Sequence, residues 1–165
     1  MDRRARLLPL GLQRLRLLDC LGGDSLHAPG YFDPAPDADL FTAFREHVAR
    51  LSREWAAETD PLVMALLAAA RFLTGDLAAA AAVLDHLPVA APQLDHNAGI
   101  CLLAPLYALR TALPLPADLT DTRRWLAGSA EQTALRAWLA DNRDRLRWVE
   151  VEGVYRLDRA AGQEF

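Results

Sequence analysis

The feature that most constrains the fold of this chain is an apolar stretch at residues 61–88, which Gly75 and Asp76 divide into two halves. In the first half, residues 62–73 contain Arg71 as their only charged side chain. A helix with so little polar surface cannot expose a whole face to water, so other elements must cover it on several sides. The stretch therefore predicts a core helix that ends at a turn around the Gly-Asp pair.

The second half of this stretch predicts another helix that folds back on the first. Its apolar side chains recur at the spacing i, i+3, i+4, i+7, on Leu77, Ala80, Ala81 and Leu84. Pro88 ends the helix. Because alanine side chains are small, the two backbones can approach closely. On this pattern Ala80 lies at the closest approach, and Ala79 lies outside the packed stripe.

Two further helices are predicted, one on each side of this pair. Before it, Asp37 or Asp39 can cap a helix. The apolar residues of that helix follow three- and four-residue steps, on Phe41, Phe44, Val48, Leu51 and Trp55. After the pair, a helix is predicted over residues 97–111, and Pro105 within it predicts either a bend or a later start. A rigid connector and a short helix around Trp125 follow.

The C-terminal part predicts a capped helix and then a change to strand periodicity. Ser129 and Gln132 have the spacing of a capping box, in which each side chain bonds the backbone amide of the other residue. The helix that they open has apolar side chains on one side, at Leu135, Trp138, Leu139 and Leu146. Residues 148–157 then fit two strands about a turn at Glu152 and Gly153. One face of this hairpin carries Trp148, Tyr155 and Leu157, and the other Val149, Val151 and Val154.

The N-terminal region fits two interpretations. Residues 3–21 mix leucine and arginine in a pattern that suits either a short helix or a strand. A loop rich in proline, glycine and aspartate follows over residues 22–36. Packing through the leucines is one interpretation, and a basic amphipathic arm that binds a membrane surface or nucleic acid is the other.

Length and composition indicate one soluble globular domain. A chain of 165 residues that is 52% hydrophobic and 24% charged can bury a core without a disulfide or a metal. No apolar run approaches the roughly 20 residues needed to cross a bilayer, and the N-terminal leucines are interrupted too often for a secretory leader. Cys20 and Cys101 match no zinc or redox spacing. A cytoplasmic protein with two reduced thiols is the expectation.

The chain contains no motif with a specific catalytic mechanism, such as HExxH, a glycine-rich phosphate loop, GxSxG or CxxC. One constellation suggests chemistry, the sequence Leu-Asp-His, which occurs twice. The first copy supplies Asp85 and His86, and the second supplies Asp95 and His96. These side chains could bind a first-row metal if the intervening loop closed, or they could simply finish one helix and cap the next. We predict that the protein is not an enzyme and has no catalytic residues, no metal and no cofactor.

The central stretch resembles a single tetratricopeptide-repeat hairpin. Leu67 and Ala68 take the large and small positions of its first helix, Gly75 and Asp76 take the turn, and Ala80 takes the small packing position of the second helix. Such repeats bind other proteins. The resemblance therefore implies a helical module with a protein partner.

The repeat pattern is incomplete. Arg71 takes a position that is usually aromatic, and Pro88 ends the second helix about one turn early. About one repeat further on, another group of residues resembles the first helix of a repeat, namely Ile100, Leu103, Ala104 and Tyr107. No matching second helix follows it. The resemblance covers less than half of the chain.

Two looser resemblances concern transcription. A capped helix with Arg45 and Leu51, followed by a helix pair with a Gly-Asp turn, is similar to the helical domain of bacterial transcriptional activators. The last helix and hairpin are similar to the final helix and wing of winged-helix DNA-binding domains. In the transcriptional activators the DNA-binding module normally precedes the helical domain, whereas the order in this chain is the reverse. The winged-helix resemblance implies that phosphates would be contacted by Arg136, Arg143 and Arg147. The net charge of −4 and the balanced charges near the hairpin argue against strong phosphate binding.

These observations predict a mainly α-helical fold, in which antiparallel helical hairpins form a repeat-like bundle with a C-terminal β-hairpin. Residues 1–165 form a single domain, with a repeat-like part at 1–117 and a winged-helix-like part at 118–165. The first hypothesis for function is a non-enzymatic module that binds another protein in a groove between helices, as part of a bacterial transcriptional regulator. The second is a winged-helix-like nucleic-acid-binding protein. The third is a metal-dependent enzyme built on the two Asp-His segments.

Overall fold

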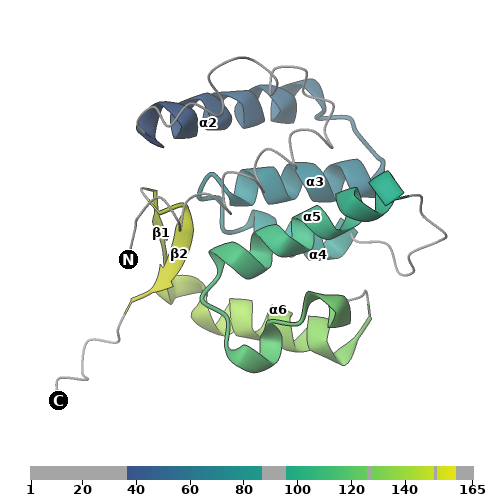
Figure 1. Cartoon of the computed structure of the whole chain (residues 1–165), viewed down its shortest axis with the longest axis vertical. Coiled ribbons are helices and arrows are strands. Elements are labelled where there is room, and N and C mark those ends of the chain that lie inside the picture. Colours follow the sequence, from purple (N-terminus) through teal and green to yellow (C-terminus); the bar gives the residue numbers. More distant parts are fainter. Residues whose placement is uncertain (1–36, 87–95, 126–127, 151, 159–165) are drawn as a thin grey trace.

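The computed structural model describes residues 37–86, 96–125, 128–150 and 152–158, and the predictions for residues 1–36 lie outside this part. The described chain is mainly helical and has a two-stranded antiparallel hairpin near its C-terminal end (Figure 1), which confirms the predicted fold class. Its α-helices are α2 (Asp37–Glu54), α3 (Pro61–Phe72), α4 (Ala79–His86), α5 (His96–Ala112) and α6 (Ala130–Asn142). The strands are β1 (Leu146–Val149) and β2 (Val154–Leu157), and the 3₁₀ helices are η2 (Ala117–Leu119), η3 (Thr122–Arg124) and η4 (Arg143–Arg145).

Helix α2 packs one apolar stripe inward and leaves its other side in water. Phe44, Val48 and Leu51 are buried, as their three- and four-residue spacing predicts. Helix α2 contacts α3. Arg45, on the exposed side, forms an ion pair with Glu150 at the turn of the β-hairpin, so α2 is connected to the C-terminal part as well.

Helix α3 is the centre of the molecule, because other helices cover it on several sides. Asp60 caps its first turn by accepting hydrogen bonds from the amides of Leu62 at 2.9 Å and Val63 at 3.1 Å. Helix α2 lies on one side of α3, and α4 and α5 lie on the other (Figure 1). Its buried residues are Ala65, Leu66, Ala68, Ala69, Ala70 and Phe72. The prediction of a core helix is confirmed.

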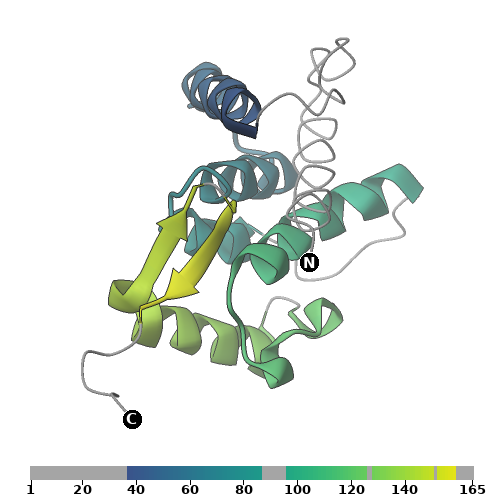
Figure 2. The same cartoon turned by 60° about the vertical axis from the view of Figure 1, so that its left-hand side comes forward.

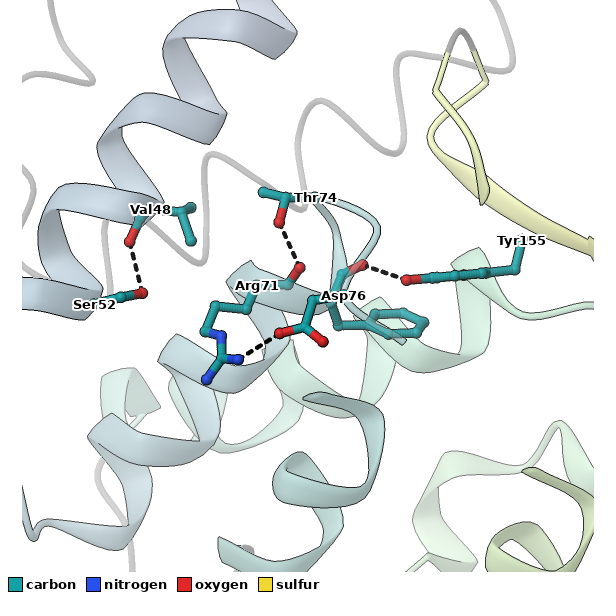
Figure 3. A network of polar contacts seen from close by, with 7 residues as sticks. Val48, Ser52, Arg71, Thr74, Asp76 and Tyr155 are labelled. Carbon is teal, nitrogen blue, oxygen red and sulfur yellow. Dashed lines mark hydrogen bonds and ion pairs between the residues drawn. The ribbon is translucent and has the colours of Figure 1, made fainter. Parts of the chain in front are cut away.

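The turn between α3 and α4 depends on Gly75, whose φ of +99° lies in the region that favours glycine. Arg71 lies near the end of α3 and forms an ion pair with Asp76 across the turn (Figure 3). Thr74 donates a hydrogen bond from its hydroxyl to the carbonyl of Arg71 at 2.6 Å. The apolar stretch tolerates this one arginine because half of its side chain remains exposed.

Helix α4 packs with a face that matches the predicted stripe only in part, since Ala80 and Leu84 are buried as predicted. Its buried residues are Ala79, Ala80, Val83 and Leu84. Ala81 is exposed, so the predicted positions of Ala79 outside the stripe and of Ala81 inside it are both wrong. The predicted stripe counts from Leu77, but the helix begins at Ala79, and Leu77 therefore does not share its phase.

Helix α5 packs against α3 and α4 and continues through Pro105, which is fully buried. The helix begins at His96, so the later start that Pro105 offered as one alternative is wrong. Ala108, Leu109 and Ala112 are buried on the inner side of the helix. Burial of the apolar proline ring offsets part of the cost of the backbone hydrogen bond that it removes.

Trp125 anchors the connector between α5 and α6. Its side chain is 1% exposed, and its indole N–H donates a hydrogen bond to the carbonyl of Leu119 at 3.1 Å. A buried indole needs such an acceptor. The predicted short helix near Trp125 is present as η3, which ends one residue earlier.

The start of α6 shows half of the predicted capping box. The hydroxyl of Ser129 accepts a hydrogen bond from the amide of Gln132 at 3.0 Å. The side chain of Gln132 does not bond back to Ser129. It is buried, and its amide donates to the carbonyl of Leu84 at 3.4 Å. The tertiary structure brings this orphan carbonyl at the end of α4 close to Gln132, and the two satisfy each other.

The β-hairpin has the predicted faces at its described residues, although β1 begins at Leu146 and not at Trp148. The prediction for Val151 lies outside the described residues. Trp148 lies opposite Tyr155, and Leu146 lies opposite Leu157, so these four side chains share one face. The prediction that Leu146 belongs to the preceding helix is wrong. Helix α6 ends at Asn142, and η4 separates it from β1, because pairing with Leu157 supplies the backbone partners that another helical turn would have supplied.

The hairpin lies beside the end of α3 (Figure 2), and its aromatic side chains make the contact. The hydroxyl of Tyr155 donates a hydrogen bond to the carbonyl of Phe72 at 3.0 Å (Figure 3), and the two rings stack with centroids 4.9 Å apart. Trp148 lies against the turn, so close that a Cβ on Gly75 would come within 2.9 Å of its ring. Residues of both predicted parts of the chain therefore contribute to one hydrophobic core.

Candidate interaction groove

The described residues form a groove between the start of α4 and the end of α6. It has a volume of about 390 Å³. Leu77, Ala78, Ala80 and Ala81 line it from the α4 side. Leu139 and Ala140 line it from α6, together with Arg136 and Arg143. The lining is therefore apolar except for two guanidinium groups.

The α4 wall is shallow because its exposed side chains are small. Ala78 and Ala81 are both exposed, and a methyl group cannot span the space between two helices. Ala80 also borders the groove, yet only 1% of its area is exposed because α3 covers it from the other side. Residues 77–81 thus include a buried alanine, Ala80, and exposed alanines that border the groove toward α6.

The opposite wall is a single stripe that runs along α6 and ends at Arg143, the first residue of η4. Arg136, Leu139, Ala140 and Arg143 follow the spacing i, i+3, i+4, i+7, which places them on one face. The two arginines are therefore about 10 Å apart along the helix axis, at 1.5 Å per residue. Leu139 and Ala140 lie between them, so an apolar centre separates two charged ends.

The two arginines differ in their partners. Arg136 Nη2 lies 2.8 Å from Asp85 Oδ1, in an ion pair that joins α6 to the end of α4. Its side chain is 38% exposed and that of Asp85 is 58% exposed, so the pair contributes only up to about 1 kcal/mol of stability. Arg143 is exposed, and its guanidinium has no ion pair within the part of the chain that the structure describes.

The structure brings together two of the three arginines that the winged-helix resemblance indicates. Arg136 and Arg143 line the groove, whereas Arg147 lies on β1. Arg147 Nε pairs with Asp158 Oδ2 at 3.0 Å, and Arg156, its cross-strand neighbour, pairs with Glu152. The outer face of the hairpin therefore carries arginines that are already neutralised by carboxylates.

The structure describes only part of the two Asp-His segments. Asp85 pairs with Arg136, and His86 ends α4. Asp95 lies outside the described residues, and the side chain of His96 is not described. Among the residues that are described, no group of three or more His, Cys, Asp or Glu side chains could hold a metal ion.

One histidine in the described part has an altered pKa. Burial lowers the pKa of His47, and the nearby charge of Arg50 lowers it further. Its Nδ1 lies 2.8 Å from Arg50 Nη2, and its Nε2 is buried without a hydrogen-bond partner among the described residues. The ring thus favours the neutral form, although the nearby charge of Glu54 raises its pKa in part.

Sequence reasoning identified the groove's charges but missed its apolar lining. Ala78, Ala81 and Ala140 have no chemistry of their own, and only the facing of α4 and α6 makes them a surface. The available signal was small residues on one side of each helix, at Ala78 and Ala81 and again beside Leu139. Such stripes occur in ordinary helix contacts too, so the pattern alone does not indicate a groove.

Comparison with known proteins adds no family. The chain matches no protein-family model, no curated protein and no solved structure. In the described residues, no helix is long and apolar enough to cross a membrane.

Proposed function

We propose that this chain is a non-enzymatic protein-interaction module, and that the groove between α4 and α6 receives a segment of its partner protein. The observation that carries the proposal is the composition of the groove, an apolar centre bordered at one end by Arg143, an exposed arginine that has no ion pair with any described residue. Apolar pockets with a few polar groups are the usual form of a binding site. The chemistry of the lining suits recognition rather than catalysis.

The size of the groove suits an anchor rather than a whole interface. A stable protein–protein contact buries about 800 Å² on each partner. The groove of about 390 Å³ holds a small number of side chains, and the surrounding surfaces of α4 and α6 would complete the contact. Binding energy in such interfaces is concentrated on a few buried anchor residues.

The resemblances to known families also support a protein-interaction function. A hairpin like that of a tetratricopeptide repeat and a likeness to the helical domain of bacterial transcriptional activators both imply a protein partner. We therefore place the proposed module in the cytoplasm, as a component of a transcriptional regulator. Its partner would be another protein of that system.

A display selection with random peptides of about 12 residues tests the proposal. Peptides that bind the wild-type protein are measured again on Ala81→Trp, which fills the groove from an exposed position, and on Ala134→Trp. Ala134 is exposed and lies on the side of α6 opposite the groove stripe, so it provides the matched control. We expect binding to fall at least about tenfold in Ala81→Trp, which corresponds to about 1.4 kcal/mol, and to persist in Ala134→Trp.

Two results would overturn this function. One is a set of selected peptides that bind both variants equally well, because the groove would then not be their site. The other is sub-micromolar, sequence-dependent binding of duplex DNA that is lost in Arg136→Ala or Arg143→Ala, since non-specific binding is expected only at about 10⁻⁴ to 10⁻⁶ M. Unfolding curves of both tryptophan variants would establish that they fold.

A further inference from the structure

We infer, on the basis of the proposed function, that the partner segment carries one large apolar side chain and, close to it, a single carboxylate that pairs with Arg143. The apolar side chain fills the centre of the groove, over Leu139 and Ala140. The carboxylate lies at the Arg143 end. A segment of this kind matches both the shape and the charge of the site.

The charge of Arg143 selects for the carboxylate. In the free protein this guanidinium is exposed to water and has no ion pair within the described residues. A partner that covers the end of the groove removes part of that water, and an unpaired charge is costly in a dehydrated contact. A carboxylate restores the lost solvation through charge-assisted hydrogen bonds, which an amide does less well and an ammonium group cannot do.

The opposite end of the groove accepts no second carboxylate. Arg136 is already paired with Asp85 at 2.8 Å, and Asp85 lies exposed beside it. A second acidic group there would meet the negative charge of Asp85 and would have to displace it from Arg136. The two ends of the groove therefore differ in charge, because Arg143 has no ion pair among the described residues at one end, whereas Asp85 neutralises Arg136 at the other.

The centre of the groove selects for an apolar side chain larger than alanine. Its lining offers methyl groups and two leucines, Leu77 and Leu139, and no polar side chain besides the two arginines. A polar side chain placed there would lose hydrogen bonds to water without replacement. Leu139 and Arg143 are one helical turn apart, about 6 Å at 1.5 Å per residue, so the apolar and acidic groups of the partner must lie close together.

Three synthetic peptide pools test this inference by fluorescence polarisation. All contain about 12 residues with a central phenylalanine and a random mixture of Ala, Ser, Thr and Gln elsewhere. They differ in one residue, which is Glu, Gln or Lys, placed four positions before the phenylalanine in half of each pool and four positions after it in the other half. Each pool is titrated with wild type, Arg143→Gln, Arg143→Glu, Ala81→Trp and, as the matched arginine outside the groove, Arg147→Gln.

We expect the Glu pool to bind wild type about fivefold more tightly than the Gln pool, the upper range for an exposed ion pair. The Lys pool should bind most weakly. Arg143→Gln should remove the difference between Glu and Gln, Arg143→Glu should make the Lys pool the tightest, and Arg147→Gln should change neither. The preference for Glu should shrink as NaCl rises from about 50 to about 500 mM.

The outcomes separate this inference from the proposed function. If the three pools bind equally and all lose affinity in Ala81→Trp, the inference is overturned while the groove remains a protein-binding site. If no pool shows binding that depends on the groove, both fail. Sedimentation that finds a dimer of wild type and a monomer of Ala81→Trp would assign the groove to a second copy of the chain and would also overturn the inference.

Discussion

The two neighbouring faces of α4 show how differently the same small residue can be used. Ala79 and Ala80 are 3% and 1% exposed, and α4 packs closely against α3. On the face toward α6, Ala78 and Ala81 are exposed and line a groove of about 390 Å³. Alanine permits close packing but does not cause it.

The difference lies in the opposing helix. Helix α3 contains small buried side chains, and Ala65, Ala69 and Ala70 have no exposed area, which allows neighbouring backbones to approach closely. Helix α6 presents Arg136 and Arg143 on its groove face. Guanidinium groups are costly to remove from water, so close packing of α4 on this wall is disfavoured where Arg136 and Arg143 lie.

The largest expected difference in stability is between truncating a core leucine of α4, Leu84, and truncating a groove leucine of α6, Leu139. Leu84→Ala leaves a cavity at a residue that is 1% exposed and should lower the free energy of unfolding by about 2 to 5 kcal/mol. Leu139→Ala removes a half-buried side chain from the groove and should cost about 1 kcal/mol. Urea denaturation of both variants measures the difference. Equal losses would mean that the groove is as tightly packed as the α3 contact.

Enlarging an alanine on each face gives the next largest difference. Ala79→Leu should cost about 1 to 3 kcal/mol through overpacking against α3, while Ala81→Leu should change stability by no more than about 0.5 kcal/mol. Thermal and urea unfolding both report the values. The reverse order would restore the helix phase that the sequence pattern predicts and contradict the observed one.

The turns before α4 and α6 each contain a glycine with a positive φ, but only the one before α4 is tightly packed. Gly75 and Gly128 have φ values of +99° and +77°, so alanine is strained at either position. A Cβ on Gly75 would also come within 2.9 Å of Trp148, whereas a Cβ on Gly128 would have no described atom within 4 Å. We expect Gly128→Ala to cost about 1 kcal/mol and Gly75→Ala to cost about 1 kcal/mol more. Similar losses in urea denaturation would show that Trp148 moves aside easily.

The smallest expected effect concerns pH and lies on α2, away from both faces of α4. Burial, with a further contribution from Arg50, lowers the pKa of His47 in the folded protein. The unfolded chain therefore takes up a proton first as the pH falls below about 6.5, and this part of the stability is lost toward acidic pH. His47→Gln should lose less stability than wild type between about pH 7.5 and 5.5 in urea titrations. An unchanged pH dependence would contradict the assignment to His47.

Helix positions could be predicted well because they depend on local chemistry. Asp60 and Pro61 start α3 through a cap and a missing amide, and alternation places Trp148 and Tyr155 on one face of the hairpin. The phase of α4 could not be predicted, because alanines at every position from Ala78 to Ala82 offer no contrast between an inner and an outer side. Burial there depends on the neighbours, which the local pattern does not contain.

The sequence by itself determined the helical hairpin, the C-terminal β-hairpin and the arginines of α6, because apolar period, turn residues and charge are local properties of the chain. Only the tertiary structure decided that Gln132 bonds the end of α4 and not its own helix cap, and that Arg136 pairs with Asp85 while Arg143 is left without an ion pair in the described region. The groove belongs to this second group. Its walls come from helices that are far apart in sequence, and the free energy of packing α4 against α3 determines which of its alanines remain to face α6.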